Sequence, residues 1–525
     1  MNGVDISGLT VSGREGAVVH PLDVRIEPGR TLAIIGESGS GKTLTAKALV
    51  GLLPRGFRAE GSVRVADTEV DLEAAQTIWR TVRGSTVTLL LQDPFTSLSP
   101  VHRCGDQIGW TLDAASDRRL VRAERERAIE ERLAEVRLPA RVAQSYPHQL
   151  SGGMRQRVAI AAALAADPQL IIADEPTTAL DASNQAEILD LLRSIQHARN
   201  LCVILISHDL GMVRGRADDV LVMRHGEVVE RGATGTVLSS PAHPYTRALL
   251  DADPALAPVT RVAEEAPPEA EGTPLLSATH VTKRFGERMV LDGASVDIAP
   301  GQIVGLVGES GSGKSTFARC IAGLEHEDDG EIRFDGTLLA PGRRSRTPAQ
   351  MQIVFQDPYS SLNPMMSVGA ILREALAVAG RPASDLTDLL TMVNLPTEFE
   401  RKRPAELSGG QRQRVAIARA LATRPRLLIC DESVSALDVS VQAQILSLLR
   451  RLREELGIGV LFISHDLAVV RMLADEVTVL WNGRVVESGP CAQVLERPRH
   501  EYTAMLVAAG RRENQISASE IAGED

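Results

Sequence analysis

The sequence predicts a protein of the α/β class, built from two tandem P-loop domains that each contain a helical subdomain. Three observations support this. A loop of the form G-x-x-x-x-G-K-[ST] occurs twice, short apolar runs alternate with amphipathic helical segments, and the motifs of the first half recur in the second. The offset is 272 residues between Lys42 and Lys314, and 257 residues between Ser151 and Ser408 and beyond. Insertions therefore lie between the motifs, where loops tolerate them.

The repeat also sets the predicted domain boundaries. We expect a first domain at 1–255, a linker at 256–274 and a second domain at 275–525. The linker segment holds four prolines and four glutamates without helical or strand periodicity, which is typical of a solvated, semi-extended spacer.

Composition narrows the class of protein. Of the 525 residues, 44% are hydrophobic and 24% charged, as in ordinary globular chains, and the net charge of −11 disfavours general nucleic-acid binding. The five cysteines are scattered without a C-x-x-C pair, which predicts reduced thiols in a cytosolic protein. No apolar run reaches 18 residues and the N-terminus lacks a signal-peptide pattern, so we expect no membrane insertion and no secretion.

Within each half, short aliphatic or β-branched runs are typical of buried parallel strands. These runs are TLAII (31–35), QLIIA (169–173), LCVILIS (201–207), QIVGLV (302–307), RLLIC (426–430) and GVLFIS (459–464). The segments between them include amphipathic helices, which predicts an α/β core. Regions 93–150 and 357–407 are richer in helix formers and charge and are interpreted as the helical subdomains.

The two loops predict nucleotide binding at two sites. Glycines let successive backbone N–H groups face phosphates, the lysine reaches the β- and γ-phosphate oxygens, and the following hydroxyl takes one Mg²⁺ position. A helix then begins and adds the positive end of its dipole. The first loop is Gly36, Glu37, Ser38, Gly39, Ser40, Gly41, Lys42 and Thr43. The second loop is Gly308, Glu309, Ser310, Gly311, Ser312, Gly313, Lys314 and Ser315.

An acidic pair ends one apolar strand of each half, where an α/β sheet places its ligand. We expect Asp174 and Asp431 to orient Mg²⁺, and Glu175 and Glu432 to polarise the attacking water. A helix-capping role would explain one isolated aspartate, but not the same pair at the same distance after LSGG in both halves.

Two further polar residues recur in each half. His208 and His465 follow the glutamates by 33 residues in the sequence ISHDL, which favours contact with the γ-phosphate or the water over a purely structural role. Gln92 and Gln356 are predicted to follow strands and to touch Mg²⁺ or water there.

Together these residues resemble the nucleotide-binding subunits of ABC transporters over nearly the whole chain. LSGG[MQ]RQR separates this family from other P-loop proteins, and the ALD segments at 179–181 and 436–438 resemble its coupling loops. The resemblance implies two composite ATP sites, in which the serine and glycines of one half complete the phosphate loop of the other. Those residues are Ser151, Gly152, Gly153, Ser408, Gly409 and Gly410.

Two further sets of motifs narrow the resemblance to one subfamily. QDPFTSLSP, QDPYSSLNP and the tails SSPAHPYTRALL and ERPRHEYTAMLVAA resemble the peptide/nickel importer ATPases. The resemblance implies a peripheral ATPase on the cytoplasmic face of the membrane, with two integral-membrane permease subunits and an extracytoplasmic solute-binding protein. One fused chain would serve each transporter, and ATP and Mg²⁺ would be its cofactors. Several relatives carry a cysteine cluster after the HPYT segment; this chain has none there, so an iron–sulfur site is not carried over. For Tyr245 and Tyr502 of the tails, ordinary packing is the expected physical role.

Several alternatives stay open. Peptides are the first choice of solute, with nickel and glutathione behind them. A soluble twin ATPase acting on ribosomes is an alternative of another class, although its usual long, charged helical linker is missing between the halves.

One departure from the family pattern concerns adenine. Phe285 stands where the family carries an aromatic that stacks on the base, but the first half has Gly13 at that position and no aromatic within 1–35. We therefore expect the first site to bind ATP more weakly, unless Arg14 or His20 substitutes.

Overall fold

The computed structural model describes residues 3–14, 16–91, 97–115, 120–177, 182–207, 209–253, 273–309, 311–355, 361–434, 437 and 439–508. The chain divides into two compact units, and the division along the sequence falls between residues 256 and 257. Of the predicted linker at 256–274, all but 273–274 lies outside the described residues. Among the described helices, none has the length and apolar character needed to cross a membrane.

A six-stranded sheet forms the centre of the first unit, with the strand order β10-β9-β3-β8-β7-β6. Neighbouring strands are parallel except for the pair β9 and β10. The strands are β3 (Thr31–Ile35), β6 (Val87–Leu90), β7 (Leu170–Asp174), β8 (Cys202–Ser207), β9 (Asp219–Arg224) and β10 (Glu227–Ala233). The predicted runs at 31–35, 169–173 and 201–207 are thus confirmed as adjacent parallel strands.

Both faces of this sheet are buried, which explains why its strands are continuously apolar. On β7, Ile172 packs into the core shared with the antiparallel sheet, whereas its neighbours Ile171 and Ala173 pack into the core of the helical subdomain. The antiparallel sheet has the order β2-β1-β4-β5. Its strands are β1 (Val4–Gly13), β2 (Gly16–Ile26), β4 (Arg58–Val65) and β5 (Thr68–Asp71).

The helices of the first unit fall into two groups. Around the sheets and in the tail lie α1 (Lys42–Ala48), α2 (Gln76–Val82), α8 (Leu210–Val213), α9 (Thr234–Ser239) and α10 (Pro244–Ala252). The helical subdomain and the long helix beside it contain α4 (Cys104–Ala115), α5 (Arg122–Glu135), the 3-10 helices at Ala140–Gln144 and Pro147–Gln149, α6 (Gly152–Leu164) and α7 (Ala182–Arg199). The subdomain therefore continues past the predicted limit of 150 into α6, which packs on α4, α5 and α7.

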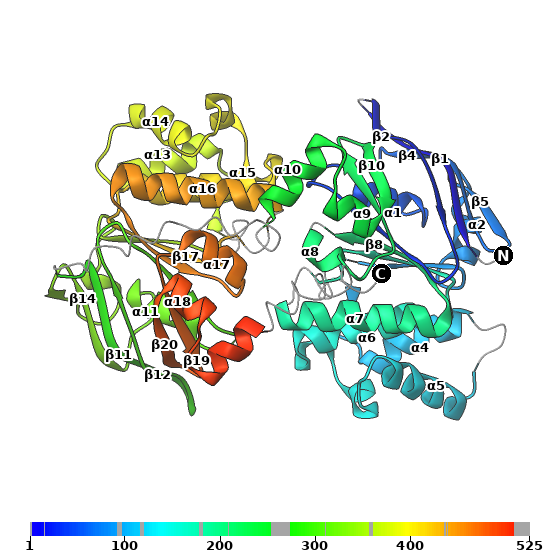
Figure 1. Cartoon of the computed structure of the whole chain (residues 1–525), viewed down its shortest axis with the longest axis horizontal. Helices are drawn as coiled ribbons and strands as arrows, with labels where there is room; N and C mark the ends of the chain where they lie inside the picture. The colour runs from blue at the N-terminus through cyan, green and yellow to red at the C-terminus, as the bar shows by residue number, and fades with distance from the viewer. Residues whose placement is uncertain are drawn as a thin grey trace. The chain divides into compact units, whose positions relative to one another are not determined.

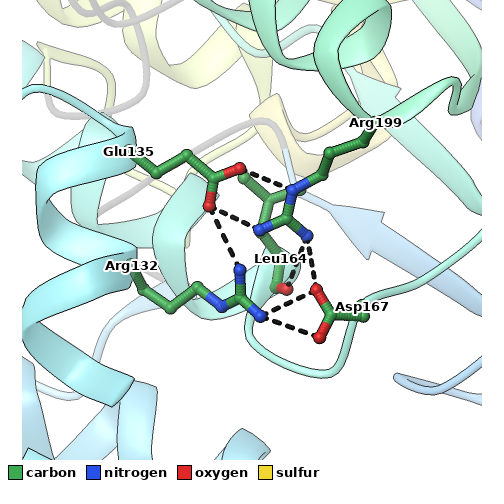
Figure 2. Close-up of polar contacts among 5 residues, drawn as sticks. All are labelled: Arg132, Glu135, Leu164, Asp167 and Arg199. Atoms are coloured by element: carbon green, nitrogen blue, oxygen red, sulfur yellow. Dashed lines mark hydrogen bonds and ion pairs between the residues drawn. The ribbon is translucent and has the colours of Figure 1, made fainter. Parts of the chain in front are cut away.

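An ionic cluster ties this subdomain to the α/β part of the first unit. Arg132 and Glu135 come from the end of α5, Asp167 from the loop between α6 and β7, and Arg199 from the end of α7 (Figure 2). Both guanidiniums contact both carboxylates, with 2.7 Å from Arg132 to Asp167 and 2.7 Å from Arg199 to Asp167. The second unit has Leu389, Met392, Arg424 and Leu456 at the corresponding positions.

The second unit repeats the architecture, with a six-stranded sheet of order β16-β17-β18-β13-β19-β20 and an antiparallel sheet of order β12-β11-β14-β15. Its strands are β11 (Leu276–Phe285), β12 (Arg288–Ile298), β13 (Ile303–Val307), β14 (Asp329–Phe334), β15 (Thr337–Leu338), β16 (Met351–Val354), β17 (Leu427–Asp431), β18 (Gly459–Ile463), β19 (Glu476–Trp481) and β20 (Arg484–Pro490). The α/β class and the duplicated arrangement are confirmed.

The helices of the second unit again separate into a core set and a subdomain set, and Figure 1 shows α13, α14, α15 and α16 grouped away from β11, β12 and β14. The core set is α11 (Lys314–Ile321), α17 (Leu467–Leu473), α18 (Cys491–Glu496), a 3-10 helix at Arg343–Ser345 and a tail helix at 501–508. The subdomain set, with its neighbour α16, is α13 (Val368–Val378), α14 (Leu386–Met392), α15 (Gly409–Leu421), α16 (Val439–Leu456) and 3-10 helices at Ala383–Asp385, Thr397–Arg401 and Pro404–Glu406.

Candidate nucleotide-binding sites

The loop at 36–43 connects β3 to α1, and its glycines are required by its geometry. Gly36 has a φ of 147°, and a Cβ on it would lie 2.1 Å from the carbonyl oxygen of Met223. Gly41 is the N-cap of α1 with a φ of 102°, in the left-handed region that glycine adopts without strain. Gly308 has a φ of 152° and Gly313 a φ of 109°, so the second loop requires glycine at the same two positions.

Each loop lysine is buried with its ammonium group held by loop carbonyls. Lys42 Nζ donates to the carbonyl oxygens of Gly36 at 2.5 Å and Glu37 at 2.9 Å. Lys314 Nζ makes the same two contacts, at 2.8 Å to each oxygen. The charge is thus held inside the loop, where it can turn to a phosphate.

A hydroxyl and a carboxylate meet beside each lysine. Thr43 Oγ1 donates to Asp174 Oδ1 at 3.3 Å, and Ser315 Oγ donates to Asp431 Oδ1 at 2.9 Å. Burial raises the pKa of Asp174 above its ordinary value, the charge of Glu175 raises it further, and the Thr43 hydrogen bond opposes the shift. Burial likewise raises the pKa of Asp431, against the opposing effect of its Ser315 hydrogen bond.

The glutamate after each aspartate has an unusual backbone conformation. Glu175 has a φ of 47° and Glu432 a φ of 46°, in the left-handed region that costs a non-glycine residue free energy. Each backbone N–H donates to the neighbouring strand, from Glu175 to Ile206 at 3.0 Å and from Glu432 to Ile463 at 3.1 Å. These backbone bonds hold the strained residue at the end of its strand.

In the second unit a histidine lies against this glutamate. His465 Nδ1 is 3.6 Å from Glu432 Oε1. The interaction with His465 lowers the pKa of Glu432, although burial opposes this. Burial acts to lower the pKa of His465, but the interaction with Glu432 outweighs it and raises that pKa above its ordinary value. The structure thus brings these two predicted site residues together.

The serine of each LSGG segment is a helix N-cap. Ser151 Oγ accepts from Met154 N at 3.4 Å at the start of α6, and Ser408 Oγ accepts from Gln411 N at 3.3 Å at the start of α15. Gln411 also accepts from Ser408 N at 3.0 Å and completes a capping box, which Met154 cannot do. Both segments present the positive end of a helix, as the sequence interpretation requires.

Some predicted site residues lie outside the described part of the chain. They are Gln92, His208, Ser310, Gln356 and, in the coupling segments, 179–181, 436 and 438. The remaining predicted residues lie in the two phosphate loops, at the ends of β7 and β17 and at the starts of α6 and α15, with His465 after β18 and Phe285 at the end of β11.

The adenine position differs between the units. Phe285 ends β11 with its ring 48% exposed, and Lys283 Nζ lies 5.3 Å from the ring centroid. Gly13 ends β1 at the corresponding position, and a Cβ on it would lie 3.2 Å from Cε1 of Phe57. An aromatic ring from the start of β4 thus occupies the place next to Gly13, which sequence reasoning limited to 1–35 missed. The sequence does carry a sign of this difference between the units. The segment from Gly51 to Gly61, which contains Phe57, is three residues longer than its counterpart from Gly323 to Gly330.

The arrangement fits a magnesium nucleotide. Among the described residues, the buried hydroxyls of Ser40 and Ser312 have no hydrogen-bond partner within the protein, so each loop retains a polar group for a ligand. A hydroxyl beside a carboxylate is the donor set that Mg²⁺ takes when phosphates and water supply its other oxygens. The described residues contain no cluster of three or more His, Cys, Asp or Glu that could form a metal site by itself.

Comparison with known families agrees with this chemistry. Residues 19–178 and 291–435 match the family described as ABC transporter. Residues 229–288 and 486–524 match the family described as oligopeptide/dipeptide transporter, C-terminal region.

Similar proteins extend over nearly the full chain. The glutathione import ATP-binding protein GsiA of Pectobacterium atrosepticum is 42% identical over 96% of this chain and 89% of its own length. The protein of the same name from Escherichia coli K12 is 42% identical over 94% of this chain and 86% of its own length. A solved dimeric, post-hydrolysis ATP-binding cassette with ADP and Pi is 26% identical, with a TM-score of 0.40, over 44% of this chain and 98% of that one.

Proposed function

The chain belongs to the ABC transporter family, and from this premise we propose that it is the ATP-hydrolysing motor subunit of an importer for small peptides. The observation that supports this best is the duplicated site. Each unit combines a buried loop lysine, a hydroxyl–aspartate pair and a strained glutamate at one strand end. ABC domains are ATPases, and these groups are the ones that phosphoryl transfer to water requires.

The residue roles follow from the geometry of each unit. Lys42 and Lys314 would neutralise the phosphates, and the hydroxyl–aspartate pairs would hold Mg²⁺, which would supply further positive charge to the phosphates. Glu175 and Glu432 would orient the attacking water. His208 and His465 would contact the γ-phosphate or that water, and Gln92 and Gln356 would touch Mg²⁺ or water. Ser151, Gly152, Gly153, Ser408, Gly409 and Gly410 would complete the site of the opposite half, so that one chain supplies both motors.

The partners and solute belong to the same proposal. We expect two integral-membrane permease subunits, an extracytoplasmic solute-binding protein and a peripheral position on the cytoplasmic face of the membrane. The match of both tails to an oligopeptide/dipeptide transporter region supports a peptide-type solute. The relatives named for glutathione import favour this tripeptide over nickel among the alternatives. No finding favours the ribosome-associated alternative.

Transport by proteoliposomes tests the proposal. The chain would be co-expressed with the permease and binding-protein genes beside it and reconstituted with ATP inside the vesicles. We expect ATP-dependent uptake of a radiolabelled tripeptide or glutathione that is lost in the double variant Glu175→Gln/Glu432→Gln. ATP hydrolysis that is stimulated by ribosomes and not by the permease complex would overturn the importer assignment.

A further inference from the structure

The tyrosine of each HPYT-type tail reaches the phosphate loop of its own unit. Tyr245 Oη accepts a hydrogen bond from the backbone N–H of Glu37 at 3.1 Å, across 208 residues of sequence. Tyr502 Oη accepts from the backbone N–H of Glu309 at 3.0 Å, across 193 residues. Both bonds end on the second residue of the loop. The two units share only part of their sequence, yet both make this contact. This indicates that the tyrosine hydroxyl has a role besides packing.

The tail residues around the tyrosine fix its position. In the first unit, His243 Nδ1 accepts from Tyr245 N at 3.1 Å and caps α10, whose first residue is Pro244. The carboxylate of Glu230 accepts from the N–H groups of Ala242 at 2.7 Å and His243 at 3.0 Å. Ala242, His243 and Pro244, which precede the tyrosine, therefore all help to fix the start of α10.

The second unit repeats this support with the corresponding residues. His500 Nδ1 accepts from Tyr502 N at 3.1 Å, and Glu487 accepts from the N–H groups of Arg499 at 2.9 Å and His500 at 3.0 Å. Burial acts to raise the pKa of Glu487, but these backbone donors lower it below its ordinary value. The carboxylate is therefore charged at neutral pH, where it accepts both hydrogen bonds.

The tyrosine rings are packed as well as bonded. Tyr245 and Tyr502 are 7% and 4% exposed. The guanidinium carbon of Arg224 lies 4.8 Å from the centroid of Tyr245, and Trp481, at the same position of the repeat, stacks on Tyr502 with centroids 5.2 Å apart. The partner on the ring face differs between the units while the hydroxyl contact does not. The shared feature is therefore the bond to the loop.

This bond acts on the residue that also holds the catalytic lysine. The N–H of Glu37 is bound by Tyr245, and the carbonyl oxygen of the same residue accepts from Lys42 Nζ at 2.9 Å. Glu309 is held in the same way between Tyr502 and Lys314. A change at the tail is thus transmitted to the lysine through a single loop residue.

We propose that Tyr245 and Tyr502 are positioning residues that hold the two phosphate loops in the conformation that binds ATP. The inference rests on the proposed ATP-binding function. It gives the tail a physical role, whereas the sequence alone used the tail only to identify the subfamily. A tyrosine that merely packs would act through its ring, whereas a positioning tyrosine acts through its hydroxyl. The Tyr→Phe change separates the two because it keeps the ring.

The first test measures nucleotide affinity of one loop at a time. With Lys314→Ala, only the first loop is intact, and Tyr245→Phe should weaken binding of a fluorescent ATP analogue about 2- to 10-fold, the usual effect of one hydrogen bond. The mirror experiment uses Lys42→Ala with Tyr502→Phe. Ser239→Ala is the matched control, because its hydroxyl bonds within the tail to Thr236 and does not reach the loop.

The second test reads the loop directly by hydrogen–deuterium exchange of the nucleotide-free chain. Tyr245→Phe should speed exchange in the peptide covering 36–43 and leave 308–315 unchanged, with a melting temperature close to that of the parent. Unchanged loop exchange and unchanged affinity in both Tyr→Phe variants would overturn the inference. If the parent chain binds no ATP analogue at all, the proposed function fails instead, and the exchange experiment still decides whether the tyrosine holds the loop.

Discussion

The ring of Phe57 lies against Gly13, so closely that a Cβ on the glycine would be 3.2 Å from Cε1 of the ring. Phe57 comes from the turn before β4, and its ring is partly buried against the core of the first unit. Gly13 and Phe285 occupy the same position of the repeat, so an aromatic ring is present beside that position in both units. We therefore expect Phe57 to offer the first site the stacking surface that its own β1 strand does not supply.

We accordingly expect Phe57→Ala, in a chain carrying Lys314→Ala, to weaken ATP binding about 5- to 150-fold, the loss of roughly 1–3 kcal/mol of stacking. Phe285→Ala in the same background is the control and should leave this affinity unchanged. Parent Lys42→Ala and Lys314→Ala chains should then bind ATP with similar affinity. If the first site binds ATP weakly and Phe57→Ala does not change its affinity, Phe57 does not stack on adenine. The weaker binding expected from Gly13 would then hold.

How far the sequence could predict the structure depends on how local each signal is. The strand ending at Asp174 was predictable because burial on both faces makes it continuously apolar. The loop lysines and acidic pairs were predictable because the chemistry fixes their spacing and the duplication repeats it. The ring of Phe57 beside Gly13 was missed because it comes from another element of the fold. The bond from Tyr245 to Glu37 joins residues 208 positions apart, and only the folded chain shows it.

Both units should hydrolyse ATP, because each places a strained glutamate at the strand end beside a complete phosphate loop. We expect Glu175→Gln and Glu432→Gln each to lower the steady-state ATPase rate. The double variant should lose about 10²–10⁴-fold, the usual contribution of a general base. An unaltered rate in one single variant would show that its site does not contribute to turnover.

The ionic cluster of Figure 2 should stabilise the first helical subdomain. Glu135 is 23% exposed and contacts both Arg132 and Arg199, so Glu135→Ala leaves two guanidiniums close together with less compensation. We expect a loss of about 1–2 kcal/mol, between the values for exposed and buried pairs. The measurement is thermal unfolding at low and high salt, and the effect should shrink in high salt.

Glu126→Ala provides the matched control for this cluster. Glu126 lies on the same helix, and among the described residues its ion-pair partner is Arg122 alone, whose side chain is 91% exposed. Its removal should change the melting temperature little, because exposed pairs contribute at most about 1 kcal/mol. Equal destabilisation by the two substitutions would mean that the cluster is no stronger than a surface pair.

The contact between His465 and Glu432 should make the stability of the nucleotide-free second unit depend on pH. The pKa of His465 is raised above 6.5 and that of Glu432 is lowered below 4.5. The contact therefore stabilises the fold fully between these two values. Stabilisation falls as pH rises through the raised pKa of His465, and also as pH falls through the lowered pKa of Glu432. Asp466 supports the charged histidine and Lys314 opposes it.

We expect His465→Gln to lower the melting temperature more at pH 5.5 than at pH 9, because a larger fraction of the parent histidine is charged at the lower pH. The measurement is thermal unfolding without nucleotide or divalent cation. His197→Gln, on the exposed face of α7, should produce no such difference between the two pH values. If the His465→Gln effect is the same at both pH values, the histidine does not change its charge between them, and this prediction is wrong.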